Sequence, residues 1–257
     1  MKISQQTAVF CAVLSLVTTS GALAQVSADG MGKIVPVELY ACNFNEGKGG
    51  DDLDQVIDRW NEFMDERDAE DYAAWTLYPY YYGPDQDFDV IWLGAMTDGN
   101  AMGAGTHMWL TEAGELADAF DDVLDCPIHI GLSSAQYKAP AGGTPDSMII
   151  TMMDCEVNKG SRYSDVKAAE LEWAEHMAAR GSAAGTFHWF PVYGDGNQDY
   201  DYKVVTAYPT FVELGADWEY FANGGGRALS MDVFDDVDEC NDARVYVGQS
   251  RRAAELR

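Results

Sequence analysis

Positive charge is scarce in this sequence. Its 257 residues include 16 lysines and arginines against 43 aspartates and glutamates, so the formal net charge is −27. A surface this acidic repels phosphate backbones and anionic lipids, which excludes nucleic acid and anionic membrane surfaces as expected partners. The excess of acidic residues is typical of a well-solvated surface, an interpretation we prefer to any specific cationic partner.

Histidine and the familiar catalytic motifs are also lacking. Only four histidines occur, and the chain contains no G-x-S-x-G, H-E-x-x-H, C-x-x-C, P-loop or Rossmann glycine pattern. The glycine-rich stretch 46–50 does not have the Walker spacing, because Cys42 stands where the first glycine is needed. We interpret this stretch as a turn from strand to helix. The sequence therefore predicts no cofactor, and it leaves open whether the protein is an enzyme.

Long apolar runs are absent beyond the first residues of the chain. Lys2, an apolar run over 8–17 and the small residues ending at Ala24 are typical of a cleaved signal peptide over 1–24. The run is too short to span a bilayer comfortably. We expect a periplasmic or extracellular protein with no membrane insertion. Cleavage removes Lys2 and no acidic residue, which changes the net charge from −27 to −28.

One sequence pattern occurs twice: FDDVLDC at 120–126 and FDDVDEC at 234–240. Each half also has a tryptophan 18 positions after its first cysteine, at Trp60 and Trp173. Similarity in the same order over about 90 positions predicts a tandem duplication of whole domains. We expect a first repeat over 33–137, a linker over 138–146 and a second repeat over 147–250.

Four cysteines remain after cleavage, two in each repeat, because Cys11 leaves with the signal peptide. An even and symmetric set in an exported protein predicts disulfides, and the closely spaced ligand pairs of a zinc site are missing. Four cysteines allow three connectivities. The duplication favours pairing within each repeat, Cys42 with Cys126 and Cys155 with Cys240. Each bridge would close a loop of roughly 85 residues, worth about 4 kcal/mol on the chain-entropy estimate.

Each repeat is expected to have the order β-α-β-β-α-β. In the first repeat we predict strands at 33–44, 72–82, 88–96 and 128–137, with helices from Asp51 to Met64 and around 109–120. The second repeat gives the same order, ending in a helical region over 211–236 and a strand at 243–250. This is the ferredoxin-like arrangement, which places the last strand beside the first and so brings the cysteines of each repeat together.

The middle strands of the first repeat are apolar or aromatic at nearly every position over 73–82 and 88–96. A sheet covered by helices on one face alone would alternate, so both faces are expected to be buried, the second against the sheet of the other repeat. The chain resembles the dimeric α+β barrel superfamily, which includes antibiotic-biosynthesis monooxygenase-type and haem-degrading proteins. That resemblance implies two ferredoxin-like units packed sheet to sheet, here as a pseudo-dimer within a monomer. The chain also resembles secreted bacterial proteins that share the pattern C…GK…W…P…FDxxxxC, a likeness that implies no activity.

Two functions from different classes remain open. The first is a non-catalytic protein that binds a small apolar or aromatic molecule between its repeats. The second is a cofactor-independent monooxygenase-like or haem-handling enzyme, in which His188 would be the base or haem ligand, although a structural role is the expected one for that histidine. The aromatic strands supply the predicted ligand lining: Trp75, Tyr78, Tyr80, Tyr82, Phe187, His188, Trp189 and Tyr193.

A calcium site is a further hypothesis for the second repeat. Asp195, Asn197, Asp199 and Asp201 offer oxygen side chains at alternate positions, as the start of an EF-hand loop does. The glycine that such a loop requires is replaced by Tyr200, and its bidentate glutamate is replaced by Thr206. We therefore favour a solvated hairpin and predict no metal.

Overall fold

The computed structural model describes residues 32–84, 86–142, 146–194, 196, 199–254 and 256. The predicted signal peptide over 1–24, with Cys11, lies outside these residues, so export stays a prediction. Within the described part of the chain, no helix is both long enough and apolar enough to cross a membrane.

The first half of the chain forms four long strands and three helices. In order they are β1 (Val35–Phe44), α1 (Gly50–Asp65), β2 (Tyr72–Tyr81), β3 (Val90–Met96), α2 (Gly99–Glu112), α3 (Gly114–Asp121) and β4 (Leu124–Lys138). The apolar stripe predicted for the first helix is buried on α1, where Leu53, Trp60 and Met64 face the sheet. The side chain of Asp98 caps α2 by accepting hydrogen bonds from the backbone N–H groups of Asn100 and Ala101.

The second half repeats this order with one extra short strand. Its elements are β5 (Ser147–Val157), α4 (Tyr163–Ala179), β6 (Gly185–Tyr193), β7 (Tyr202–Tyr208), α5 (Phe211–Asn223), α6 (Gly226–Phe234), β8 (Asp238–Cys240) and β9 (Arg244–Arg252). Two boundaries differ from the sequence-based expectation. The helix predicted around 109–120 is the pair α2 and α3, and β4 starts at Leu124 because that residue pairs with Phe44 before the disulfide is reached.

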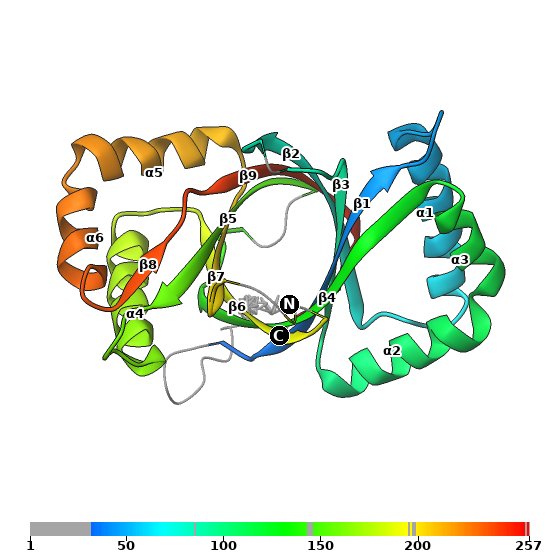
Figure 1. Ribbon diagram of the computed structural model, residues 1–257, viewed down its shortest axis with the longest axis horizontal. Helices are drawn as coiled ribbons and strands as arrows, with labels where there is room; N and C mark the ends of the chain where they lie inside the picture. The colour runs from blue at the N-terminus through cyan, green and yellow to red at the C-terminus, as the bar shows by residue number, and fades with distance from the viewer. Residues whose placement is uncertain are drawn as a thin grey trace, which may run out of the picture.

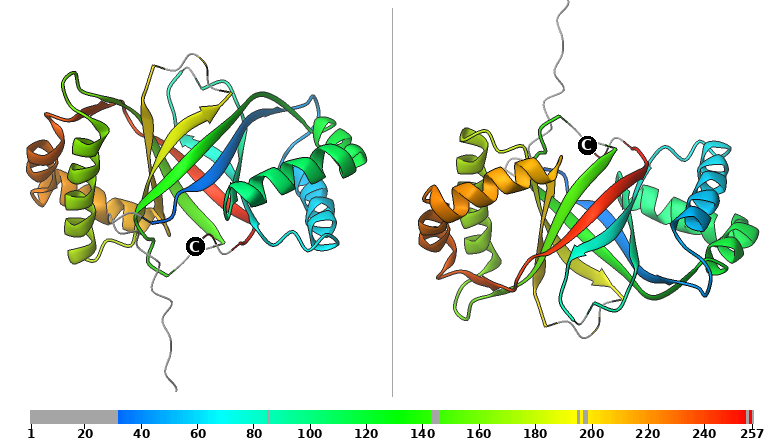
Figure 2. Two further views of the ribbon diagram at one scale, coloured as in Figure 1. Left: turned by 90° about the horizontal axis from the view of Figure 1, so that it is seen from below. Right: turned by 90° about the horizontal axis from the view of Figure 1, so that it is seen from above.

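Eight antiparallel strands close into a barrel, with the helices outside it. The order around the barrel is β1-β3-β2-β9-β5-β7-β6-β4, and β4 then returns to β1. Viewed end-on, the strands form a ring, with α1, α2 and α3 on one side and α4, α5 and α6 on the other (Figure 1). The two views along the perpendicular direction show the strands crossing at a tilt between the two helical layers (Figure 2). The predicted barrel is therefore present as a mixed α+β fold.

Two seams join the halves. At one, β2 of the first half pairs with β9 of the second; at the other, β4 pairs with β6. The two sheets therefore share hydrogen-bonded edges as well as facing each other across the interior. Closure of the barrel removes the exposed sheet edges that each half would have alone.

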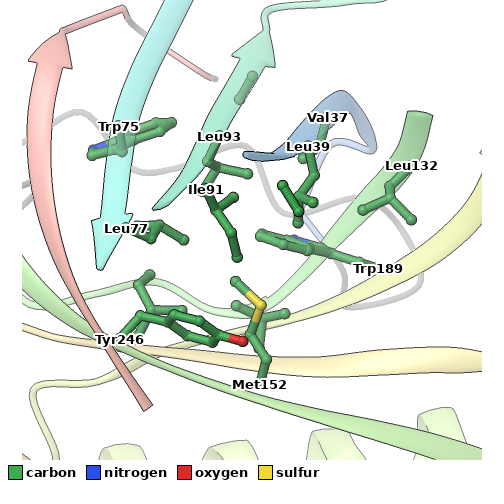
Figure 3. Packing of buried hydrophobic residues seen from close by; sticks show 14 of the residues in the cluster. Val37, Leu39, Trp75, Leu77, Ile91, Leu93, Leu132, Met152, Trp189 and Tyr246 are labelled. Carbon is green, nitrogen blue, oxygen red and sulfur yellow. The ribbon is translucent and has the colours of Figure 1, made fainter. Parts of the chain in front are cut away.

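The barrel interior is a packed apolar core. Side chains from all eight strands meet there, among them Leu39, Trp75, Leu93, Met152 and Trp189 (Figure 3). Ala73, Trp75 and Leu77 of β2 point inward, while the alternate residues Ala74 and Thr76 are buried outside the barrel. Burial on both faces explains why these strands are apolar at nearly every position. An eight-stranded barrel is just wide enough for such side chains to fill it.

Both disulfides form within the halves, as predicted. Cys42 bonds to Cys126 and Cys155 bonds to Cys240. Cys155 lies directly opposite Cys240 in the pairing of β5 with β8. Each bridge therefore fixes the end of the first strand of a half to the strand segment that follows its helices.

Candidate functional site

A network of polar side chains is buried between the barrel and α4 in the second half. His188 of β6 has no solvent exposure, and Glu170 of α4 is 3% exposed. The Nε2 atom of His188 lies 3.3 Å from Oε2 of Glu170. Burying two ionisable groups costs free energy unless they are hydrogen-bonded to each other or to neighbours. Because solvent does not reach this pair, its hydrogen-bonding groups need partners from the surrounding side chains.

Two tyrosines extend this network on the other side of the imidazole. The hydroxyl of Tyr163, at the start of α4, lies 2.9 Å from Nδ1 of His188. The hydroxyl of Tyr137 lies 2.6 Å from that of Tyr163, and Tyr137 comes from β4 in the first half of the chain. Burial is the main cause that raises the pKa of Tyr163 above its ordinary value, and the hydrogen bond with Tyr137 adds to it, so Tyr163 stays protonated.

A hydrogen-bonded pair of Tyr202 and Asp238 packs beside the imidazole of His188. Tyr202 of β7 has no solvent exposure and packs on His188 with ring centroids 4.8 Å apart. Its hydroxyl donates a hydrogen bond to Asp238 of β8. Burial raises the pKa of Asp238, while the hydrogen bond from Tyr202 opposes that rise. Burial is also the main cause of the raised pKa of Tyr202.

One atom of the network has no hydrogen-bond partner. Oε1 of Glu170 is buried, and no donor reaches it among the described residues. A buried and unsatisfied carboxyl oxygen costs about 1–3 kcal/mol. A helix packed on this face of the barrel does not need a carboxyl at this position, because the first half has an apolar residue at the equivalent one.

The equivalent positions in the first half carry no such network. Equivalence follows from the cysteines and from the strand pairing: Cys155 faces Tyr202 where Cys42 faces Val90, and Glu170 follows Cys155 by the 15 positions that separate Ile57 from Cys42. The groups Tyr163, Glu170, His188, Tyr202 and Asp238 stand where the first half has Gly50, Ile57, Thr76, Val90 and Leu124. Ile57, Val90 and Leu124 belong to an apolar core of the first half, and no ionisable residue stands at any of these five positions.

The sixth equivalent pair is Tyr137 and Arg251. Arg251 donates from Nε to the hydroxyl of Thr76 at 2.8 Å and pairs with Asp54 at 2.9 Å. Tyr137 occupies the corresponding place over His188, with ring centroids 4.4 Å apart. The two halves therefore have the same framework and different chemistry, and the polar site is built from five elements, α4, β6, β7 and β8 of the second half and β4 of the first.

An open groove lies beside this network, where the end of β4 meets α4. Its volume is about 680 Å³, and it is lined by Tyr137, Lys138, Ala139, Ala141, Leu171, Ala174, Glu175, Ala178, Gly181 and Ser182. A bulge in the pairing of β4 with β6 falls between Gln136 and Lys138. An extra residue in a strand breaks the strict alternation of faces, which explains why the consecutive residues Tyr137 and Lys138 both reach the groove.

Lys138 supplies positive charge to the groove. Its Nζ donates to the backbone carbonyls of Ser182, at 2.7 Å, and Ala184. An ammonium group has three donors, so one remains without an acceptor in the part of the chain that the structure describes. Burial lowers the pKa of Lys138, and the charge of Asp217 partly offsets that effect.

The structure brings together three of the eight residues predicted to line a ligand site. Trp75, Phe187 and Trp189 face the barrel interior, where they belong to the packed core. Tyr78 packs on the first helical layer, on the opposite face of the sheet. The remaining tyrosines, Tyr80, Tyr82 and Tyr193, are 52%, 59% and 63% exposed. His188 faces α4, away from the interior. The hollow that the structure shows lies outside the barrel, where no residue of this set is among its lining.

The predicted calcium loop is described in part. Asp195 and Asn197 lie outside the described residues, so the hypothesis of a calcium site there stays a prediction. Asp201 accepts the backbone N–H of Val157 at 2.8 Å, and its first-half equivalent Asp89 does the same for Phe44 at 3.0 Å. In both halves this aspartate therefore fixes a turn.

One group of potential metal ligands occurs among the described residues: Cys155, Asp238 and Cys240. Both sulfur atoms belong to the disulfide, so no thiolate is available to a metal ion.

Comparison with known proteins places the fold. No known protein family matches the chain, and no curated protein matches it. Seventy chains of solved structures are similar to it. One is a protein that carries the provisional name chlorite dismutase: 11% of residues are identical, 85% of this chain and 95% of that one are covered, and the TM-score is 0.52. A likeness at this identity shows a shared α+β barrel fold and no shared activity.

Two further solved structures have lower scores. A haem-binding protein from Thermus thermophilus shows 11% identity over 86% of this chain and 94% of that one, with a TM-score of 0.49. An anthrone oxidase-like protein shows 8% identity over 89% and 97%, with a TM-score of 0.45.

The described histidines do not fit the requirements of a haem ligand. A ligand needs one ring nitrogen free to face an open space, whereas both nitrogens of His188 are engaged and the ring is fully buried. His176 lies 2.5 Å from the hydroxyl of Tyr220, and His129 stacks on Tyr40. His107 is exposed on α2. No histidine is among the residues that line the groove.

Proposed function

We propose that this protein is an exported α+β barrel protein that binds a small, largely apolar molecule in the groove between β4 and α4. The observation that carries the proposal is the position of the groove against the polar network that only the second half possesses. Its volume is within the range of small-molecule sites, and its lining is mostly alanine, leucine and tyrosine with a few polar groups. The site lies where the first half of the chain meets the second.

The architecture proposed with this function is a tandem pair of ferredoxin-like repeats in one polypeptide. The shared element order, the equivalent disulfides and the paired aspartates Asp89 and Asp201 support a duplication. Two disulfides suit the oxidising compartment that export would provide. After duplication, one repeat could keep an apolar helical layer while the other gained the polar groups.

A haem-handling enzyme is the second candidate function. It is favoured by the fold shared with the provisional chlorite dismutase, and one other neighbour is named as a haem-binding protein. For His188 to bind haem it would have to give up one of its two hydrogen bonds and open the space it fills. We therefore rank this function below the binding of an apolar molecule, and we derive no chemical step through haem.

The groove can be tested with the fluorescent dye N-phenyl-1-naphthylamine, a small neutral aromatic molecule. Ala178 lines the groove and is exposed, so Ala178→Phe should fill the groove without disturbing the core. Ala179 is its exposed neighbour on α4 and does not line the groove, which makes Ala179→Phe a matched control. We expect the dye affinity to fall about tenfold in the first variant alone, a loss of about 1.4 kcal/mol.

Equal dye binding by the two variants would contradict the proposal, because the dye would then bind elsewhere. A haem titration of the same proteins separates the two candidate functions. A Soret shift that Ala178→Phe leaves unchanged and His188→Gln abolishes would favour haem handling instead.

A further inference from the structure

The buried network forms an unbroken path from the groove to Glu170. Tyr137 lines the groove, and its hydroxyl is 2.6 Å from that of Tyr163. The path continues to Nδ1 of His188 at 2.9 Å and from Nε2 to Glu170 at 3.3 Å. With the imidazole proton on Nε2, every member donates toward the carboxylate. Each member also carries a proton that can move, so the path can pass a proton inward.

Glu170 is suited to be the end of this path. Its Oε1 is buried with no donor among the described residues, so the carboxylate has an unused acceptor site. The groups packed around the path are Tyr202 from β7 and Asp238 from β8, which are bonded to each other and supply no donor to Oε1. A structural role alone does not explain the carboxyl, because Ile57 fills the equivalent position in the first half.

Lys138 supplies the positive charge that a deprotonated ligand in the groove would need. Deprotonating a bound molecule creates an anion, and an ammonium group with one donor to spare stabilises that anion. The opposite charge of Glu175 also lines the groove. Glu175 would disfavour a molecule that is fully ionised before it arrives, which points to a weak acid that enters neutral.

We propose that the groove binds small, largely apolar weak acids, with one acidic hydroxyl placed at Tyr137, and takes up their proton. The ligand O–H bond breaks as its proton bonds to the oxygen of Tyr137. The proton of Tyr137 moves to Tyr163, that of Tyr163 to Nδ1 of His188, and that of Nε2 to Glu170. The products are a ligand anion beside Lys138 and a protonated Glu170, with no other bond changed. This inference rests on the proposed binding function and specifies its ligand class.

The probe for this inference is 4-nitrophenol, whose neutral and anionic forms absorb at different wavelengths. Its ionisation is titrated in the presence of the full-length mature protein and in buffer alone. We expect the ionisation midpoint of the bound probe to fall by about one pH unit, which is a tenfold preference for the anion. Glu170→Gln keeps the shape of the side chain and removes the acceptor, so the midpoint should return to that of the free probe.

Controls make the result specific. Ile57→Val changes the equivalent first-half position and should leave the midpoint of the bound probe lowered. Tyr137→Phe keeps the ring that lines the groove and removes the first hydroxyl of the path, so it should act like Glu170→Gln. Melting curves of each variant show that the fold is retained.

The possible failures are distinguishable. If the protein does not bind the probe, both the proposed function and this inference are overturned. If the probe binds, is displaced by the groove-filling Ala178→Phe change, and ionises as it does in buffer, the proton path is overturned and the binding function stands. A lowered midpoint that persists in Glu170→Gln also overturns the path, because Lys138 alone would then account for it.

Discussion

Tyr137 and His188 lie with their ring centroids 4.4 Å apart, and they come from different halves of the chain. The contact crosses the seam at which β4 pairs with β6, where His188 lies opposite Ala135. The candidate site therefore exists only when the barrel is closed. Neither half alone could form the path from the groove to Glu170.

The polar network should cost stability rather than supply it. Replacing His188 by Gln alone leaves partners unsatisfied, and we expect a loss of about 1–3 kcal/mol in the free energy of unfolding. Replacing Glu170 by Leu and His188 by Phe together removes both buried polar groups at similar volume. We expect that double variant to unfold at or above the midpoint of the wild type in urea. A double variant less stable than His188→Gln would show that the pair is structural.

The barrel interior should be far more sensitive to truncation than the exposed aromatic residues of the same strand region. Leu77 has no solvent exposure and lies in the interior core, whereas Tyr82 is 59% exposed. Leu77→Ala should lower the free energy of unfolding by about 2–5 kcal/mol, because it leaves a cavity in a packed core. Tyr82→Ala should change it by less than about 0.5 kcal/mol. Denaturant titrations of the two variants give the comparison, and similar losses would contradict a packed interior.

Asp154 should contribute stability that depends on pH. Burial alone would raise the pKa of this carboxyl, but ion pairs with Lys203 at 2.5 Å and Arg244 at 2.7 Å outweigh burial and lower the pKa. A group whose pKa is lowered on folding stabilises the protein above its unfolded pKa of about 3.9, and this stability is lost as the pH falls through the folded value. Asp154→Asn should therefore cost about 2 kcal/mol at neutral pH.

The difference between wild type and Asp154→Asn should begin to shrink below about pH 4 and should vanish only below the lowered pKa of the folded state, where the carboxyl is neutral in both states of the wild type. Thermal melts across the acid range measure it. Asp232→Asn, at an exposed position on α6, is the control for loss of one negative charge. A difference that stays constant down to the lowest pH would refute the contribution of the ion pairs.

Cleavage of the connection between the halves should give two fragments that have no covalent link but stay associated under native conditions. Both disulfides lie within a half, so a protein cut between Gly142 and Asp146 should give two fragments on a denaturing gel without reductant. Under native conditions the seams β2–β9 and β4–β6 should hold the fragments together in gel filtration. Fragments that migrate as one band until a reductant is added would contradict the pairing.

The sequence predicts much of this framework because its signals are local or repeated. The stripe from Leu53 to Met64 predicts α1, and the matched cysteines predict both disulfides, each confirmed by the structure. The uninterrupted apolar strands predict burial on both faces, which the barrel provides. The glycine-rich start of α2 has no apolar stripe, because α2 has no buried residue. The sequence therefore contains no periodic pattern that would predict where this helix begins.

The candidate site was largely beyond prediction because its members come from β4, α4, β6, β7 and β8. Of the network, the sequence singled out His188 alone. A position-by-position comparison of the two halves would have shown Glu170 opposite Ile57 and Asp238 opposite Leu124. That comparison shows which polar residues are out of place in a core. It does not show that they converge, since convergence depends on the pairing of strands distant in the chain.

The position of β9 has a consequence for how the chain is made. This last strand lies between β2 and β5, and it pairs with residues synthesised about 90 to 180 positions earlier. Until Arg244–Arg252 has left the ribosome, both neighbours keep an unpaired edge. Such late and distant pairing is slow, and open edges recruit other chains. A nascent chain halted before Arg244 is thus a template for aggregation, and a holding chaperone on the way out would have those two edges to cover.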